Sequence, residues 1–263
     1  HEQISITLRE AGRLALDLGD RDLLVGVARS RGAMGDNSAE VDPDRLAVLD
    51  AALGAVGPDD SAERAHLLAC LAEETDPRDV AERVALATEA IEVAQRVGDE
   101  PTLLAVLNLV LSPLNTPDTH QLRSASAALA IEIGERLGDL SALVHAHYFR
   151  AYCDVEAGDL AAFDVHLAAM RPLSASTGLP TDEFMVAMLG AWRHLLAGRT
   201  EEAAAESDRM LEIGTRIEFA VIESTYGAQV LQRTAKQGGL AAIVDLVVEA
   251  MENSPAIPTW RCA

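Results

Sequence analysis

Three short stretches of the sequence decide the fold. They are Ala-Gly-Asp-Leu at 157–160, Ala-Gly-Arg-Thr at 197–200 and Gln-Gly-Gly-Leu at 237–240, and an Ala-rich segment follows each of them. Their glycines stand 40 residues apart, and a second set lies midway with the same spacing: Gly98, Gly138 and Gly178. Regular recurrence of a helix-breaking residue is typical of stacked helical hairpins. The rhythm therefore predicts a helical-repeat architecture.

The segments before the interleaved glycines share one apolar pattern. Before Gly98 and Gly138 the matching positions are Ala90, Val93 and Val97, and Ala130, Ile133 and Leu137. The same template fits Ala11, Leu14, Leu18 and Gly19, then Leu49, Leu53, Val56 and Gly57, then Met170, Leu173 and Gly178, and last Met210, Ile213 and Ile217 with Glu218 in the glycine position. Offsets of three and four place these residues on one face of a helix. We expect the glycine to end that helix in the left-handed conformation and the Asp after it to cap the next one.

The pattern predicts an all-α, right-handed superhelix of about six tetratricopeptide-like helical hairpins with a period of about 40 residues, forming a single domain over 1–263. The first helices, which would line a concave groove, are expected at 20–34, 60–73, 100–113, 139–156, 180–196 and 219–236. Starts of second helices are expected at Asp42-Pro43, Asp76-Pro77 and Pro117-Asp118, since a capping side chain beside proline favours a first turn. Residues 32–42 are expected to form a loop.

Composition narrows the classes of partner. Acidic residues outnumber basic ones by 42 to 21, for a net charge of -21. Binding to a phosphate backbone needs a Lys- and Arg-rich surface, so this charge disfavours direct contact with nucleic acid and with an anionic membrane. Hydrophobic residues make up 49% of the chain and aromatic ones only 3%, so small aliphatic side chains must fill the core.

The cysteines predict the cellular compartment, and the chain ends predict whether the sequence is a fragment. Cys70, Cys153 and Cys262 are odd in number and widely spaced, which is typical of reduced thiols in a cytoplasmic protein. No apolar run approaches the 18 or so residues of a transmembrane helix. Because the sequence begins at His1 rather than Met, and stops at Trp260-Arg-Cys-Ala without a charged tail, we expect a fragment of a longer chain.

Catalytic and metal-binding motifs are missing from the sequence. Gly32-Ala-Met-Gly35 lacks the lysine of a phosphate-binding loop, and no zinc-protease or nucleophile-elbow motif occurs. His145 and His147 point about 200° apart on a helix, so they do not form one metal site, and one of them is expected to face the groove. The charges of Asp154 and Glu156 should raise the pKa of the Cys153 thiol, which favours a structural cysteine. We therefore expect no catalytic residue, no metal and no cofactor.

The residues expected in the groove come from the first helices. The candidates are Asn108, His147, Arg150, Arg193, Tyr226 and Gln229. Arg150 and Arg193 could hold a carboxylate or phosphate together, although pairing with a nearby Asp or Glu is the favoured alternative. Tyr152 and Trp192 stand 40 residues apart in the same repeat position, which favours packing over a ligand cage.

Several stretches resemble the helical-repeat region of large actinobacterial regulators. They are Val41-Asp-Pro, Leu49-Asp-Ala-Ala-Leu, Asp60–Glu74, Leu137-Gly-Asp, Ala191-Trp-Arg, Leu196–Ala203 and Pro255–Arg261. Members of that group carry an ATPase module before the repeats, and some add a LuxR-type helix-turn-helix or an adenylate cyclase domain. The chain has no phosphate-binding loop, cyclase core or helix-turn-helix of its own, so the resemblance implies no activity for these residues.

The resemblance implies a cytoplasmic, non-catalytic sensor or protein-interaction region of a signalling or transcriptional regulator. Its concave groove would bind a peptide, a partner protein or a small effector, and the adjacent domains of the parent chain would be further partners. The alternative is an architectural or oligomerisation spacer between an ATPase or cyclase module and an output domain. An enzyme on a helical scaffold would need converging His or acidic residues, which the spacing does not provide.

Overall fold

A computed structural model describes residues 2–30, 41–219, 222–245 and 247–248, with side chains from residue 6 onward. These residues form helices and no strand, which confirms the predicted all-α class. The α-helices are α1 Glu2–Leu18, α2 Arg21–Arg29, α3 Pro43–Val56, α4 Ala62–Glu74, α5 Val80–Val97, α6 Glu100–Val110, α7 His120–Leu137, α8 Leu140–Glu156, α9 Leu160–Thr177, α10 Pro180–Leu196, α11 Thr200–Arg216 and α12 Ile222–Lys236. Two short 3-10 helices, η1 Pro117–Thr119 and η2 Leu240–Ala242, complete the described elements. Most of the loop expected at 32–42, and also Trp260 and Cys262, lie outside these residues.

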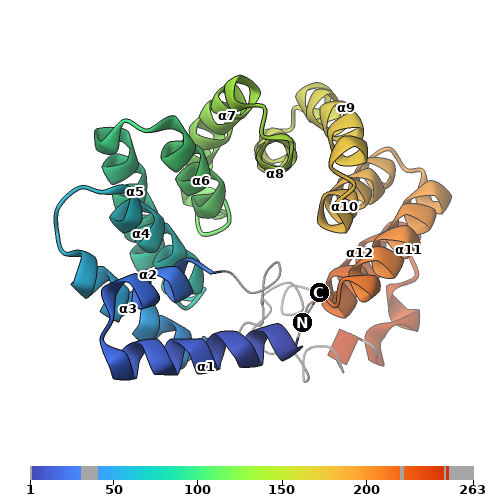
Figure 1. The fold of residues 1–263 in the computed structure, drawn as a ribbon. Helices are drawn as coiled ribbons and strands as arrows, with labels where there is room; N and C mark the ends of the chain where they lie inside the picture. The colour runs from blue at the N-terminus through green and yellow to red at the C-terminus, as the bar shows by residue number, and fades with distance from the viewer. Residues whose placement is uncertain (1, 31–40, 220–221, 246, 249–263) are drawn as a thin grey trace. The chain divides into compact units, whose positions relative to one another are not determined.

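The chain divides into two compact units. Unit 1 holds α1 to α9 and ends at Thr177, and unit 2 begins at Gly178 and holds α10 to α12. Figure 1 shows the helices of each unit, coloured in chain order from blue to red. The single continuous domain and the superhelix expected from the sequence stay predictions.

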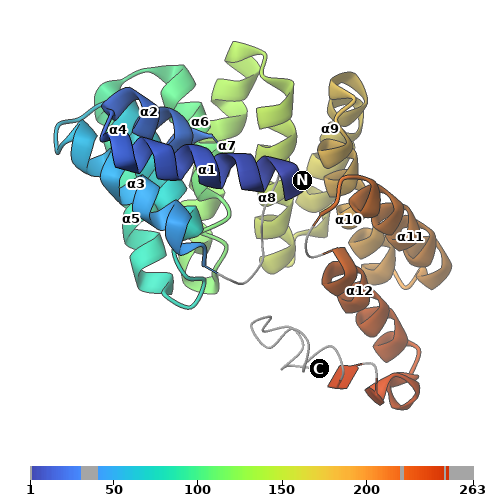
Figure 2. The ribbon, with the colours of Figure 1, turned by 60° about the horizontal axis from the view of Figure 1, so that its bottom comes forward.

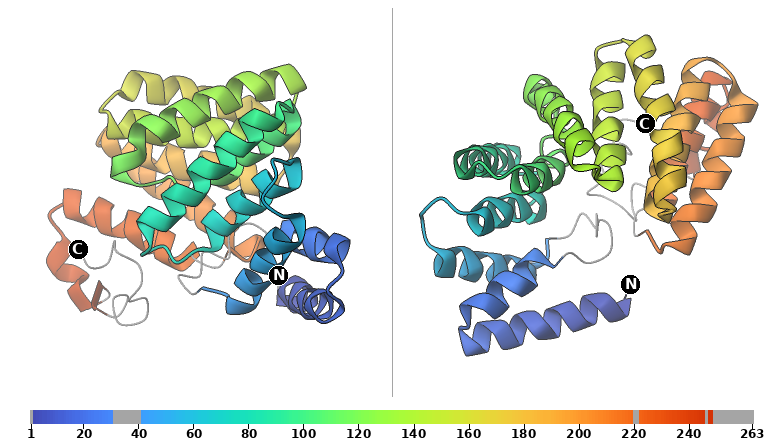
Figure 3. Two further views of the ribbon diagram at one scale, coloured as in Figure 1. Left: turned by 90° about the vertical axis from the view of Figure 1, so that its left-hand side faces the viewer. Right: turned by 45° about the horizontal axis from the view of Figure 1, so that its top comes forward.

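The helices pack in neighbouring pairs within each unit. In unit 1 the pairs are α2 with α3, α4 with α5, α6 with α7 and α8 with α9; in unit 2, α10 packs against α11. Figure 3 shows α10 and α11 side by side in its right-hand view. The first helices also contact one another, α2 with α4, α4 with α6, α6 with α8, and in unit 2 α10 with α12. Helix α1 lies against α2 and α3 (Figure 2).

Local sequence explains where the helices begin. Asp20, Asp99 and Asp139, each just after a glycine, accept hydrogen bonds from backbone amides of Leu23, Thr102 and Ala142 at 2.9–3.0 Å. These bonds satisfy amides that have no partner within the helix, as the sequence predicted. Asp42 caps α3 and Pro43 occupies its first turn, also as predicted.

Two predicted helix starts shift in the structure. The start expected at Asp76-Pro77 is wrong by about one turn, because these residues form a turn before α5, which begins at Val80 after Asp79. The turn is held by Asp76, which accepts hydrogen bonds from the backbone and the side chain of Arg78. At Pro117-Asp118 the chain forms η1, and α7 follows it at His120.

The junctions between helices close through the left-handed residues that the rhythm predicted. Gly98, Gly138 and Gly178 have φ of 74°, 70° and 62°, and Gly158, Gly198 and Gly238 have φ of 73–77°. At Glu218 the backbone adopts the same region with φ 51°, the only such residue other than glycine in the described chain. The amide of Phe219 donates to the carbonyl of Gly214 at 2.9 Å, the same six-residue closure that Arg199 and His194 make at 2.9 Å around Gly198. Glu218 thus replaces glycine without changing the turn.

Glycine at position 218 is expected to stabilise unit 2. A side chain in the left-handed region costs the folded chain about 1 kcal/mol. Glycine removes this cost, but it also makes the unfolded chain more flexible, and that offsets part of the gain. Glu218→Gly should therefore raise the free energy of unfolding by about 0.5–1 kcal/mol. The measurement is urea unfolding followed by fluorescence, with Gly198→Ala as the reverse control. Gly198 has φ 76° and no atom within 4 Å of an added Cβ, so its loss reports conformation alone. Equal stability of Glu218→Gly and the parent chain would show that the backbone at Glu218 is not strained.

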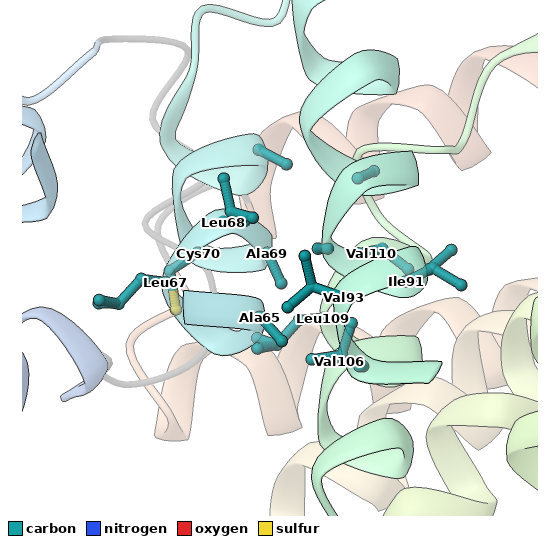
Figure 4. Close-up of a cluster of buried hydrophobic side chains, with 14 of the residues drawn as sticks. Ala65, Leu67, Leu68, Ala69, Cys70, Ile91, Val93, Val106, Leu109 and Val110 are labelled. Atoms are coloured by element: carbon teal, nitrogen blue, oxygen red, sulfur yellow. The ribbon is translucent and has the colours of Figure 1, made fainter. Parts of the chain in front are cut away.

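Small aliphatic side chains build the core of unit 1, as the composition predicted. Figure 4 shows Val93 of α5 among Ala65 and Ala69 of α4 and Val106 and Leu109 of α6. All five side chains are at most 6% exposed. Alanine at the contact positions allows α4 and α5 to approach closely, so the second helix of one pair packs against the first helices on both sides of it.

Candidate functional site

Helix α8 brings two of the predicted site residues, His147 and Arg150, into one cluster. Asp139 caps its start, and the chain leaves it at Ala157 before the left-handed Gly158. The helix packs between α7 and α9 and also touches α6, so polar residues on α8 meet neighbours on both sides. We call the group formed by His147, Arg150 and Asp154 of α8, Ser124 of α7 and His166 of α9 the α8 polar cluster.

The α8 polar cluster is a continuous chain of contacts. The Nδ1 atoms of His147 and His166 are 2.8 Å apart, and Nε2 of His166 lies 3.5 Å from Oδ2 of Asp154. Nε of Arg150 lies 3.4 Å from Oδ1 of Asp154, and Nη1 of Arg150 donates to the backbone oxygen of Ser124 at 3.1 Å and to its Oγ at 2.5 Å. Arg150 therefore pairs with an acid on its own helix, the favoured alternative at the sequence level.

Burial sets the protonation of the cluster. Asp154 is 5% exposed, and among the described residues its Oδ2 has no hydrogen-bond partner, since the 3.5 Å approach of His166 is too long for one. Burial raises the pKa of this carboxyl even though Arg150 opposes the shift. Burial, and then the nearby His166, lowers the pKa of His147 to about 4. The pKa of His166 is lowered by burial and by the charge of Arg150. Both imidazoles are thus neutral at pH 7, and one donates to the other.

The remaining predicted residue of unit 1, Asn108 of α6, meets a second face of α8. Nδ1 of His145 is 3.0 Å from Oδ1 of Asn108, whose amide donates to the carbonyl of Leu104 at 3.1 Å. The two histidines of the His145/His147 pair therefore point to different helices, as predicted, and each meets a polar partner. Beside them the hydroxyl of Tyr148 donates to that of Tyr152 at 3.1 Å. Burial raises the pKa of Tyr152 to about 12.

Sequence reasoning missed the most deeply buried charge of this region. Arg123 of α7 is fully buried, and its guanidinium donates to the carbonyl of Leu114 at 3.2 Å, to Oδ1 of Asn115 at 2.8 Å and to Sγ of Cys153 at 3.3 Å. It also forms an ion pair with Glu156. The signal in the sequence was an arginine among small residues in 120–137, but its partners lie up to 33 positions away.

Cys153 behaves as a structural thiol. It is 1% exposed, and the pKa of the thiol is raised, as predicted. The larger cause is burial, with the charge of Glu156 as a smaller one, whereas Arg123 acts in the opposite direction. A thiol that stays protonated is a poor nucleophile. Among the described residues, no three His, Cys, Asp or Glu side chains are arranged to hold a metal ion.

The remaining predicted residues belong to unit 2. Arg193 is half-buried on α10, and on α12 the hydroxyl of Tyr226 donates to Oδ1 of Asp208 at 2.9 Å. Gln229 is 4% exposed, and within the described chain neither atom of its amide has a hydrogen-bond partner. Because Arg150 and Arg193 belong to different units, their joint binding of an anion stays a prediction.

No protein-family model matches this sequence, and no curated protein matches it either. No helix in the described ranges is long and apolar enough to cross a bilayer.

Proposed function

We propose that this chain is a non-catalytic helical-repeat region of a larger signalling or transcriptional regulator. In this proposal the helix pairs continue as a right-handed superhelix of about six hairpins, and its concave groove binds a peptide, a partner protein or a small effector. The observation that carries the proposal is the contact of each first helix with the next within a unit, α2 through α8 in unit 1 and α10 with α12 in unit 2. A continuous row of first helices lines the binding surface of solenoid proteins.

The α8 polar cluster is the part of that row best suited to a polar ligand. The side chain of Arg150 keeps 30% of its surface exposed while Ser124 and Asp154 hold its direction. A guanidinium held in this way binds a carboxylate with little loss of side-chain freedom. His147 adds a hydrogen-bonding group three residues before Arg150 on the same helix. We expect the ligand to be anionic at the group that meets Arg150.

A thermal-shift screen tests the proposal with three classes of ligand: acidic peptides, basic peptides and nucleotides. A ligand at 100 times its Kd should stabilise the protein by about 2.7 kcal/mol. Arg150→Lys keeps the positive charge but loses the planar guanidinium, which can donate two parallel hydrogen bonds to one carboxylate. It should weaken binding of an acidic peptide about tenfold. Arg136→Lys is the matched control, because Arg136 lies on the second helix α7 and is 51% exposed. No stabilisation by any of the three classes would contradict the sensor role.

Light scattering across concentration tests the spacer alternative, since an oligomeriser would gain mass with concentration.

A further inference from the structure

A group of buried polar atoms without partners lies in the described part of unit 2. They are Oε2 of Glu206 on α11 and, on α12, both polar atoms of the Gln229 amide and Nη1 of Arg233. Elsewhere in the described chain, only Oδ2 of Asp154 shares this property among buried side-chain atoms. A buried polar group normally has a hydrogen-bond partner, and one without it costs stability. Their concentration at one place points to a binding site.

The register of α11 and α12 shows how these groups are placed. Ile222, the first residue of α12, lies directly against Gly214 near the end of α11. One turn later, the hydroxyl of Tyr226 donates to Oδ1 of Asp208 at 2.9 Å. The two helices therefore run antiparallel, and each turn forward along α12 meets a turn further back along α11.

Continuing this register by one turn places Gln229 level with Glu206. The carboxyl carbon of Glu206 lies 3.5 Å from where a Cβ on Gly190 of α10 would be. Arg233 follows Gln229 by one turn on the same face of α12, and its guanidinium interacts with the hydroxyl of Tyr226. The side chain of Arg233 thus runs back along α12 past Gln229. An acid, a base and an amide therefore lie around one place between α11 and α12.

We propose that this place binds a small zwitterion of the α-amino-acid class. The ammonium group of the ligand donates to Glu206, and its carboxylate accepts from Arg233. The carbonyl oxygen of Gln229 accepts from the ammonium group and its NH2 donates to the carboxylate, so both atoms of the amide are satisfied. The inference rests on the small-effector form of the proposed function, but it uses no residue of the α8 polar cluster.

Burial favours a small ligand over a second protein segment. Gln229 is 4% exposed, so a helix laid on the outer surface of α12, from this chain or another, does not reach its amide. Glu206 and Arg233 are only half-buried, and rotation of these two long side chains admits a molecule of a few atoms. A free amino acid carries both charges next to one carbon atom, whereas a peptide separates its ammonium and carboxylate groups along the chain.

A thermal-shift screen with free L-amino acids, each at millimolar concentration, tests the proposal on the full chain. We expect at least one of them to raise the unfolding midpoint by several degrees. Tryptophan fluorescence reports on unit 2, since Trp192 and Trp260 both belong to it. The N-acetyl and the amide derivative of that amino acid each lose one charge and should bind at least tenfold more weakly. A screen in which no amino acid raises the midpoint would overturn the proposal.

Two charge variants test the orientation of the ligand. Glu206→Gln should bind the free amino acid and its N-acetyl derivative with similar affinity, yet still discriminate against the amide. Arg233→Gln should do the reverse. Loss of both discriminations in either variant, or of neither, would overturn the assigned contacts.

Gln229→Met separates a ligand site from an amide that is satisfied inside the chain. Because it removes two buried polar atoms without partners, it should raise the unfolding midpoint measured without amino acid and abolish the response to amino acid. Gln232→Met is the matched control, since Gln232 is exposed on the same helix, and it should change neither quantity. A lower midpoint in Gln229→Met would mean that the amide has a partner within the chain, and the proposal would be wrong.

Arg150→Lys distinguishes this inference from the proposed function. It should leave the response to amino acid unchanged, because Arg150 belongs to unit 1, although it weakens binding of an acidic peptide. An amino-acid response that Arg150→Lys abolishes and Gln229→Met does not would place the ligand at the α8 polar cluster and overturn the inference.

Discussion

Replacing Arg123 by alanine is expected to lower the free energy of unfolding of unit 1 by about 3–5 kcal/mol, because the change leaves buried partners without their donor. The guanidinium is fully buried and joins the segment after α6, through Leu114 and Asn115, to Cys153 and Glu156 of α8. Arg123→Met keeps most of the apolar volume and should lose less than Arg123→Ala. Arg136→Ala on the same helix should lose less than about 1 kcal/mol, because Arg136 and its partner Glu100 are both about half exposed.

The measurement is urea unfolding followed by far-UV circular dichroism, together with hydrogen exchange of the α7 and α8 amides. Fluorescence is unsuitable, since Trp192 and Trp260 both lie beyond unit 1. A loss in Arg123→Ala no greater than that in Arg136→Ala would contradict the role of Arg123 as a buried connector.

The second large expected effect is a dependence of the free energy of unfolding on pH, caused by His147. In the folded chain the pKa of His147 is lowered to about 4 from an ordinary value of 6.5, so folding favours the neutral imidazole. Its contribution is present in full above pH 6.5 and is lost as the pH falls toward 4. A shift of this size corresponds to roughly 2–3 kcal/mol at about 1.4 kcal/mol per pKa unit, less some solvent screening.

A comparison of variants isolates that contribution. The parent chain should lose roughly 2–3 kcal/mol more than His147→Gln between pH 7 and pH 4. Asp154 acts with the opposite sign, because its raised pKa favours the protonated carboxyl in the folded chain, but it is common to both proteins. His166→Gln removes the second cause of the His147 shift and should reduce the pH dependence in part. Identical pH profiles for the parent chain and His147→Gln would show that His147 is not buried in its neutral form.

Much of the local structure could be predicted because it depends on short-range chemistry. Glycine adopts the left-handed region at little cost, so its rhythm located helix ends such as Gly98, and an aspartate after it located the caps. The break in the glycine pattern at Glu218 was also visible in the sequence, because glycine was expected at that position. The start at Asp76-Pro77 was misplaced because a side-chain turn with Arg78 competes with the helix.

The candidate site could be predicted only in part. His147 and Arg150 were found because they lie on a first helix, but their partners Ser124 and His166 belong to α7 and α9. Arg123 was missed, because an arginine in a helix is usually solvated and no pattern within α7 distinguishes a buried one. The exposure of Leu14 was hidden for the same reason, since its sequence template equals that of the buried Val93.

By itself, the sequence determined the all-α class, most of the places where helices begin and end, and the small aliphatic core, since each of these follows from residue chemistry within a few turns. Only the tertiary structure decided which polar groups are buried and which apolar ones are not. Burial depends on the neighbouring helix and not on the residue: among the described residues it leaves Asp154 without a hydrogen-bond partner at Oδ2, holds His147 neutral and encloses Arg123, while Leu14 stays exposed because none of the described helices covers it.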